Sequence, residues 1–252
     1  MTATASIEAC ACCGSKELTF QKILWDELVQ AWRISEYERE YIDRQQGLAC
    51  RVCRSNLRSM ALALAICRCY GYAGTLERFV KERSNKGLRI LEVNEAGGLT
   101  QFLSQLPKHC IGRYPELDMM QMPFDDGAFD LVVHSDTLEH VPHPITALSE
   151  CWRVLAPGGF CAFTVPMILD RMTVGRAGLP LSYHDTPQQR AADFAVQTEY
   201  GCDSWKHVVL AGFQECRLIA LEFPAALALV GVRSAAGVEK ELWPRIQQRA
   251  PA

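Results

Sequence analysis

The sequence has no long hydrophobic run, no strong net charge and no internal repeat, and each absence narrows the class of protein. The most apolar stretch, residues 60–67, is much shorter than the roughly 20 residues that a membrane-spanning helix needs. The first residues lack the basic start and apolar segment of a secretory signal. Lys and Arg (26) nearly balance Asp and Glu (29), so that the net charge is −3. We therefore expect a cytoplasmic chain that favours neither a membrane nor nucleic acid as a partner.

What is present is typical of a packed globular protein. Hydrophobic residues make up 49% and charged residues 22% of the 252 positions, which suits one large domain or a medium domain with a small appendage. The twelve cysteines are many for such a chain. Without a secretory signal they are expected to be reduced thiols or metal ligands and not a disulfide framework.

The first part of the chain, residues 1–84, has helical patterns and no convincing strand. Apolar spacing predicts helices over residues 22–32, 35–47, 56–70 and 75–83. In the second of these, Ser35 and Glu38 have the spacing of a capping box, and Gly47 is a suitable end. We expect this part to form a small helical, cysteine-rich module.

From residue 85 on, compact apolar runs alternate with helical segments. The expected strands are residues 88–93, 129–135, 159–166, 216–223 and 226–232. The expected helices are residues 99–106, 144–154 and 202–211. This alternation predicts an α/β domain over residues 85–234, with a mostly parallel sheet and helices on both faces. The short link between the last two strands predicts an antiparallel hairpin at the sheet edge, and residues 235–252 form a C-terminal tail.

Two Cys-x-x-Cys pairs lie in the first part: Cys10 with Cys13, and Cys50 with Cys53. Each pair puts two thiolates on one tight turn, and two such turns can close a tetrahedral zinc site. Four thiolates fill the coordination sphere, so this zinc would be structural and would hold together helices with little core of their own. Cys12 could replace Cys10 or Cys13 as a ligand, and four buried free cysteines are the alternative.

Two blocks of sequence in the α/β part point to one superfamily. Residues 122–142 contain Met-Pro-Phe, then Phe-Asp-Leu-Val, then Leu-Glu-His-Val, and residues 152–159 are Trp-Arg-Val-Leu-Ala-Pro-Gly-Gly. In order and spacing they resemble the small-molecule branch of the class I S-adenosylmethionine-dependent methyltransferases. The Cys-x-x-Cys pairs resemble those that precede this domain in some bacterial members. The resemblance implies a Rossmann-like fold with a seven-stranded sheet, S-adenosylmethionine as cofactor, and methyl transfer to a metabolite, sugar or natural-product intermediate.

The resemblance also implies roles for single residues around the cofactor. Glu92, at the end of the first strand, corresponds to the acid that orients the following loop and engages the cofactor ammonium through water. Asp118 corresponds to the acid that accepts a hydrogen bond from the adenine amino group, with Met119 beside the ring. Ser135 and Asp136, at the end of the central strand, should border the methionine end of the cofactor.

The loop after the first strand departs from the family pattern Glu-x-Gly-x-Gly-x-Gly. This chain has Glu-Val-Asn-Glu-Ala-Gly-Gly, in which Gly98 alone keeps its place. Asn94 can adopt the left-handed conformation that a glycine would supply, and Ala96 adds a methyl group where backbone and cofactor should be close. Residues 106–122 leave little room for the usual second strand with its ribose-binding acid, for which Glu116 is a candidate.

A general base is needed only if the methyl acceptor must lose a proton, and the candidates are His140, Tyr183 and His184. His140 belongs to Leu-Glu-His-Val, which members with different substrates share, so a structural or cofactor-proximal role competes with base catalysis. His184 beside Asp185 or Glu199 could be a base oriented by a carboxylate. A surface Tyr-His-Asp turn ahead of a proline is the alternative.

Two other classes of function stay open. His134, Asp136, His140 and His184 could hold a catalytic metal ion on the same scaffold, although no tight ligand spacing singles them out. A non-catalytic derivative that has lost cofactor affinity would explain the loop with few glycines. Binding of S-adenosylmethionine separates both from a methyltransferase.

Overall fold

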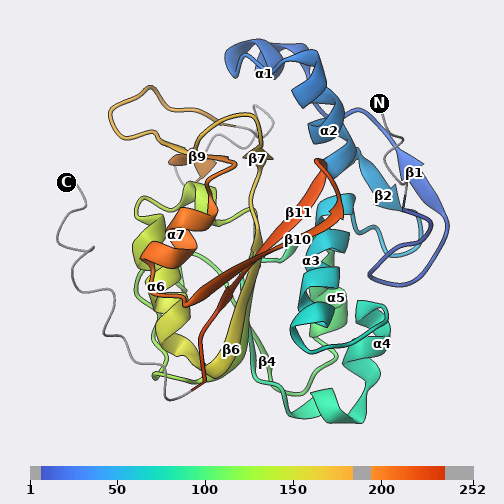
Figure 1. Cartoon of the computed structure of the whole chain (residues 1–252), viewed down its shortest axis with the longest axis vertical. Helices are drawn as coiled ribbons and strands as arrows, with labels where there is room; N and C mark the ends of the chain where they lie inside the picture. The colour runs from blue at the N-terminus through green and yellow to red at the C-terminus, as the bar shows by residue number, and fades with distance from the viewer. Residues whose placement is uncertain (1–6, 184–193, 236–252) are drawn as a thin grey trace.

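The structure is a computed structural model that describes residues 7–183 and 194–235 (Figure 1). The first part contains β1 (Leu18–Phe20), α1 (Asp26–Ala31), α2 (Glu36–Gly47), β2 (Leu48–Cys50), α3 (Leu57–Cys69), α4 (Leu76–Lys81) and η1 (Arg83–Gly87). The four predicted helices are confirmed. The expectation that this part has no strand is wrong, because β1 and β2 pair antiparallel with Leu18 opposite Cys50. Each strand has three residues, which is too short for a recognisable period.

Local sequence explains where the longer of these helices begin. The Ser35 hydroxyl accepts from the backbone N–H of Glu38, and the Glu38 carboxylate accepts from the backbone N–H of Ser35, which is the predicted capping box. The Asn56 side chain accepts from the backbone N–H of Ser59 and caps α3. These caps fix the point at which the chain turns from each loop into α2 and α3.

The second part forms the main sheet. Its elements are β3 (Ile90–Val93), η2 (Gly97–Leu99), α5 (Thr100–Leu103), β4 (His109–Gly112), β5 (Phe129–Ser135), η3 (Leu138–His140), α6 (Pro144–Val154), β6 (Leu155–Thr164), α7 (Trp205–Leu210), β10 (Glu215–Glu222) and β11 (Ala226–Val232). The strand order is β10-β11-β6-β5-β3-β4. The pairs among β3, β4, β5 and β6 are parallel, and β11 is antiparallel to both its neighbours. The Rossmann-like α/β class and the edge hairpin are confirmed.

The number of strands differs from the prediction. Within the described residues the main sheet has six strands instead of seven. β4 supplies the second strand for which the sequence left little room, and no strand or helix forms between β4 and β5. The connection there, residues 113–128, is too short for both a further strand and a crossover helix.

Helices cover the two faces of the sheet (Figure 1). α3 packs on β6, β10 and β11, with α4 and α5 beside it, and α6 and α7 cover the opposite face. α3 is almost wholly apolar and is buried over ten of its thirteen residues. The core on its face includes Cys10, Cys50 and Leu62 from the first part together with Leu131 and Val230 from the sheet. The cysteine-rich segment and the α/β sheet therefore share one core.

A second, smaller sheet follows β6. It consists of β7 (Met167–Ile168), β8 (Val174–Gly175) and β9 (Thr198–Gly201), in the order β7-β9-β8. Figure 1 shows β7 and β9 at the same end of the molecule as α1 and α2. Among the described residues, no helix combines the length and the apolar character that crossing a membrane requires.

Candidate functional site

A cavity of about 760 Å³ opens where β3, β4 and β5 end. Parallel strands point their carboxyl ends to one edge of the sheet, and in open α/β sheets this edge is where ligands bind. Five of the seven residues predicted to bind the cofactor line this cavity: Asn94, Asp118, Met119, Ser135 and Asp136. Glu92 and Gly98 do not line it, and each has a different place in the structure.

Glu92 lies behind the cavity and has no exposed surface. One carboxylate oxygen accepts from the backbone N–H of Ala96 at 2.8 Å and from the Thr100 hydroxyl at 2.5 Å. The other lies 2.7 Å from Nε2 of His109 on β4. The carboxylate thus ties the loop after β3 to the start of α5 and to the neighbouring strand. This is the loop-orienting geometry that the resemblance implied.

Two left-handed residues shape the loop. Asn94 has φ = +56°, as predicted, and its side chain donates to the Thr137 hydroxyl and accepts from the backbone N–H of Tyr114. Gly97 also has φ = +56° and lines the cavity. The sequence suggested that the methyl group of Ala96 would lie close to the cofactor. In the structure Ala96 is fully buried and lies outside the cavity lining, so its methyl group does not obstruct the cavity.

Gly98 faces the first part of the chain. A Cβ atom there would lie 2.5 Å from the Ser55 hydroxyl oxygen and 2.9 Å from the Ser55 Cα atom. The backbone N–H of Gly98 donates to the Ser59 hydroxyl at 3.2 Å. The glycine is therefore needed for close packing against the segment that leads into α3, and Gly97 takes the position beside the cavity.

The segment after β4 forms another wall of the cavity. Asp118 Oδ1 accepts from the backbone N–H of Met120 at 2.8 Å, which holds the carboxylate in a tight turn. Met119 is buried against the same wall. Glu116 is exposed and does not line the cavity. Glu95, in the loop after β3, also lines the cavity and forms an ion pair with Arg113 at 2.8 Å.

An ion pair links the end of β5 to α3. Nη2 of Arg58 lies 2.5 Å from Oδ2 of Asp136, and the Ser135 hydroxyl donates to the same oxygen at 3.2 Å. Asp136 has φ = +49°, a conformation that costs energy in a residue other than glycine. Arg58 is buried, so the ion pair is shielded from water on one side.

Arg58 of α3 and Gln46 of α2 also line the cavity, and neither was predicted from the sequence. A signal for Arg58 was available: the first turn of α3 holds no acidic residue, and Arg58 places a positive charge there. A cation near a helix N-terminus is unfavourable without a partner, so it indicates one elsewhere in the fold. Gln46 offered no such signal.

The candidate bases have different positions. His140 lines the cavity, and its Nδ1 lies 3.3 Å from the Ala195 carbonyl oxygen. Tyr183 is half-buried and lines neither this cavity nor the second one described below. His184 and its possible partner Asp185 lie outside the described residues. Glu199, the other possible partner, forms an ion pair with Arg176.

His134 does not line the cavity and is fully buried beside Cys151 of α6. Its ring stacks on Phe163 at 4.7 Å between centroids, and burial lowers the pKa of His134 to about 3. It therefore stays neutral at physiological pH. The described residues gather His134 with Cys151 and Cys161 and not with Asp136 and His140, so the proposed catalytic metal set does not come together among them.

A second cavity of about 250 Å³ adjoins the first, and Gln46 lines both. Its walls come from α1, α2 and the segment between β6 and β9. The residues that line it from that segment and from β9 are Pro166, Met167, Ile168, Arg171, Met172, Val174, Glu199 and Tyr200. The contribution of α1 and α2 was not expected.

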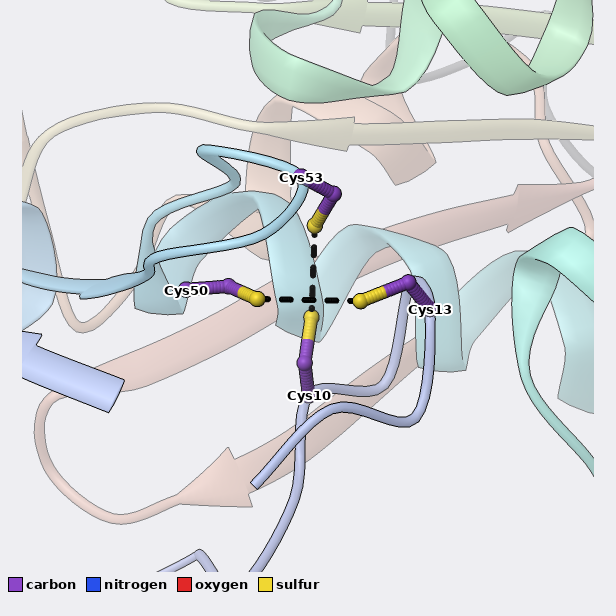
Figure 2. A group of neighbouring side chains, drawn as sticks. All are labelled: Cys10, Cys13, Cys50 and Cys53. Atoms are coloured by element: carbon purple, nitrogen blue, oxygen red, sulfur yellow. Dashed lines mark hydrogen bonds between the residues drawn. The ribbon is translucent and has the colours of Figure 1, made fainter. Parts of the chain in front are cut away.

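The four cysteines of the two Cys-x-x-Cys pairs converge on one point (Figure 2). Sγ of Cys10 lies 3.6 Å from that of Cys53, and Sγ of Cys13 lies 3.6 Å from that of Cys50. All four sulfur atoms lie within 4.8 Å of one another. Tetrahedral zinc with Zn–S bonds of about 2.3 Å separates its sulfur ligands by about 3.8 Å, whereas a disulfide needs about 2.05 Å. The thiols therefore fit a tetrahedral metal ion.

Cys12 lies outside this group of four. Its thiol is fully buried and donates to the backbone carbonyl of Ser59 on α3 at 3.9 Å. Hydrogen bonding from Cys12 also lowers the pKa values of the Cys10 and Cys53 thiols. Cys12 therefore lies beside the four clustered thiols, and its hydrogen bonding favours the thiolate form of Cys10 and Cys53.

A known protein family matches the segment that forms most of the main sheet. Residues 89–163 match the model of the methyltransferase domain family. These residues contain β3, β4, β5 and all of β6 except Thr164, and they include the ends of β3, β4 and β5 that border the large cavity. This match agrees with the resemblance to methyltransferases that the sequence of this segment shows.

Curated relatives match over part of their length. A sarcosine/dimethylglycine N-methyltransferase of Halorhodospira halochloris is 39% identical over 26% of this chain and 28% of its own. A ubiquinone biosynthesis O-methyltransferase of Nitrosococcus oceani is 30% identical over 35% of this chain and 48% of its own. The chain thus spans less than half the length of either relative. Among solved structures, a SAM-dependent methyltransferase from Methanosarcina mazei gives a TM-score of 0.38 at 11% identity, covering 60% of this chain and 94% of that one.

Proposed function

We propose that the protein transfers a methyl group from S-adenosylmethionine to a small molecule. The observation that carries this proposal is the large cavity at the ends of β3, β4 and β5, bordered by Asn94, Asp118 and Asp136 within the methyltransferase domain. Its volume of about 760 Å³ lies within the range of cofactor sites. The curated relatives are named as enzymes that act on sarcosine, dimethylglycine or a ubiquinone precursor.

When bound, S-adenosylmethionine supplies an electrophilic methyl group, so the protein has mainly to hold and align the reactants. Glu92 holds the loop whose backbone faces the amino acid end of the cofactor. Asp118 and Met119 line the cavity, where Asp118 would accept a hydrogen bond from the adenine amino group and Met119 would pack beside the ring. Ser135 and Asp136, the latter paired with Arg58, border the methionine end.

A proton must be removed only from acceptors that carry one on the attacking atom. Among the described residues, His140 is the candidate that lines the cavity, with its Nδ1 near a backbone carbonyl. That contact orients the ring, and Nε2 lies 3.8 Å from a carboxylate oxygen of Glu139. Tyr183 and His184 follow on the segment beyond the second cavity and stay candidates for an acceptor bound there.

We also propose that Cys10, Cys13, Cys50 and Cys53 hold one structural zinc ion. The convergence of four thiols within 4.8 Å supports this, and four sulfur ligands leave no open position for a substrate. The ion would join the turn that precedes β1, at residues 10–13, to the turn between β2 and α3, at residues 50–53. All twelve cysteines are free thiols, which suits a reducing compartment such as the cytoplasm.

Calorimetric titration with S-adenosylmethionine tests the proposed activity. We expect micromolar binding by the wild-type protein and at least tenfold weaker binding by Asp118→Ala, because that variant loses the acid beside the adenine. Asp125→Ala changes an exposed acid on the same connection and should bind as the wild type does. No binding at millimolar cofactor would refute the proposal and favour the non-catalytic derivative.

A further inference from the structure

The second cavity is walled by two parts of the chain that lie far apart in the sequence. Trp25, Leu28 and Trp32, in and beside α1, form one side, and Met167, Met172 and Tyr200 form the other. α1 does not join either of the two large cores. Its apolar side chains form a small cluster with Leu24 and Ile34. A helix of six residues without a side-chain cap has little stability by itself. Its stability therefore depends on its contacts around this cavity.

The charged side chains in the wall are already paired. Arg171 binds the Glu38 carboxylate through two nitrogens at 2.8 and 2.9 Å, and it also donates to backbone carbonyls at the end of α1. Glu199 is paired with Arg176. The Gln45 amide donates to the Ala225 carbonyl and accepts from Arg58. The charges thus neutralise each other within the protein, and a charged ligand would lose its hydration without gaining an ionic partner.

The volume sets the size of the ligand. An apolar protein cavity of about 150 Å³ accommodates one benzene molecule. At about 250 Å³, this cavity takes a group larger than one ring, such as a fused bicyclic aromatic system or an aliphatic chain of similar bulk. The two tryptophans suit an aromatic ligand because ring pairs add to the free energy of apolar burial.

We propose that this cavity binds the methyl acceptor, and that the acceptor is an uncharged, mainly apolar molecule with a bicyclic aromatic group or one of similar size. This rests on the proposed methyl transfer. Gln46 lines both cavities, so a ligand in the apolar cavity would reach the cofactor cavity beside this side chain. The first part of the chain then has a second task besides metal binding: α1 and α2 select the substrate.

Methionine methyl groups report on the two cavities separately. Met167 and Met172 line the apolar cavity, whereas Met119 and Met120 line the cofactor cavity. We would label the methionine methyl carbons with ¹³C and titrate the full chain with 2-naphthol, with S-adenosylhomocysteine, and with both. We expect 2-naphthol to shift the Met167 and Met172 signals, S-adenosylhomocysteine to shift those of Met119 and Met120, and both ligands to bind at once.

A pair of variants tests the location. Met172→Asp places a carboxylate at the mouth of the apolar cavity, where the native side chain is 55% exposed, so folding should tolerate it. We expect at least tenfold weaker 2-naphthol binding and unchanged S-adenosylhomocysteine binding. Leu181→Asp, at a 71% exposed position outside both cavities, should leave both affinities unchanged.

The possible failures can be told apart. If S-adenosylhomocysteine binds but 2-naphthol leaves Met167 and Met172 unshifted, the apolar acceptor site is refuted and the proposed methyl transfer stands. If 2-naphthol competes with S-adenosylhomocysteine, it occupies the cofactor cavity, and the acceptor assignment is also refuted. If S-adenosylhomocysteine itself fails to bind, both the proposed function and the acceptor assignment are refuted.

Discussion

Replacement of Glu92 is the sharpest test of how the cofactor loop is held. The Glu92→Ala variant removes an acceptor from three groups: the buried N–H of Ala96, the hydroxyl of Thr100 and Nε2 of His109. A buried polar group without a partner costs about 1–3 kcal/mol. Thr100 is half-buried and can reach water, so the other two groups set an expected loss of about 2–6 kcal/mol in the free energy of unfolding.

The Glu92→Gln variant separates shape from charge. It keeps an acceptor for the Ala96 N–H and loses the added strength of charged hydrogen bonds, so we expect a smaller loss of about 1–2 kcal/mol. The matched control is Glu95→Ala in the same loop, where the acid is exposed and its ion pair with Arg113 contributes below about 1 kcal/mol.

Urea unfolding followed by circular dichroism measures these differences, and calorimetry with S-adenosylhomocysteine measures the effect on the cofactor. A Glu92→Ala protein as stable as Glu95→Ala would refute the reasoning, because the buried carboxylate would then not be what holds the loop.

Three further variants test other parts of the account. Arg58→Met leaves Asp136 without its ion-pair partner and should weaken S-adenosylhomocysteine binding at least tenfold in calorimetry; unchanged affinity would show that the pair plays no part in binding. Cys53→Ser should lower the zinc content, measured by mass spectrometry, from one ion per chain to almost none and cost about 4 kcal/mol or more of stability, whereas Cys110→Ser, at an exposed cysteine, should keep the metal. The pKa of His134 is lowered from 6.5 to about 3 in the folded state, so its contribution to stability is complete above pH 6.5 and is lost as the pH falls toward 3. His134→Phe should therefore reduce the slope of unfolding free energy against pH by up to about 1.4 kcal/mol per pH unit in this window, and an unchanged slope in urea titrations would contradict the assignment.

The elements predicted well are those whose signal is local. The capping box at Ser35 needs only residues within one turn, and α6 and β11 have the predicted bounds because their apolar periods are unbroken. The residue type of Asn94 permits a left-handed conformation, and the structure has it there. The four cysteines that converge were recognisable as a group because two Cys-x-x-Cys pairs have the spacing of two metal-binding turns.

The features that were missed depend on distant contacts. β4 has no buried residue in its four positions, so no apolar run marked it. Gly98 was assigned to the cofactor, but its role comes from Ser55, more than forty positions earlier. Gln46 and Arg58 reach the large cavity only because α2 and α3 pack against the sheet. The walls of a site that joins separate segments are set by tertiary packing, which a single sequence does not display.

A crystal structure with S-adenosylhomocysteine tests the central claim most directly. The account predicts the ligand in the large cavity, with its amino acid end against the loop that follows β3, its adenine beside Asp118 and Met119, and its sulfur directed toward Gln46 and the apolar cavity. A ligand bound elsewhere, or clear density for an empty cavity from crystals grown at saturating ligand, would contradict it.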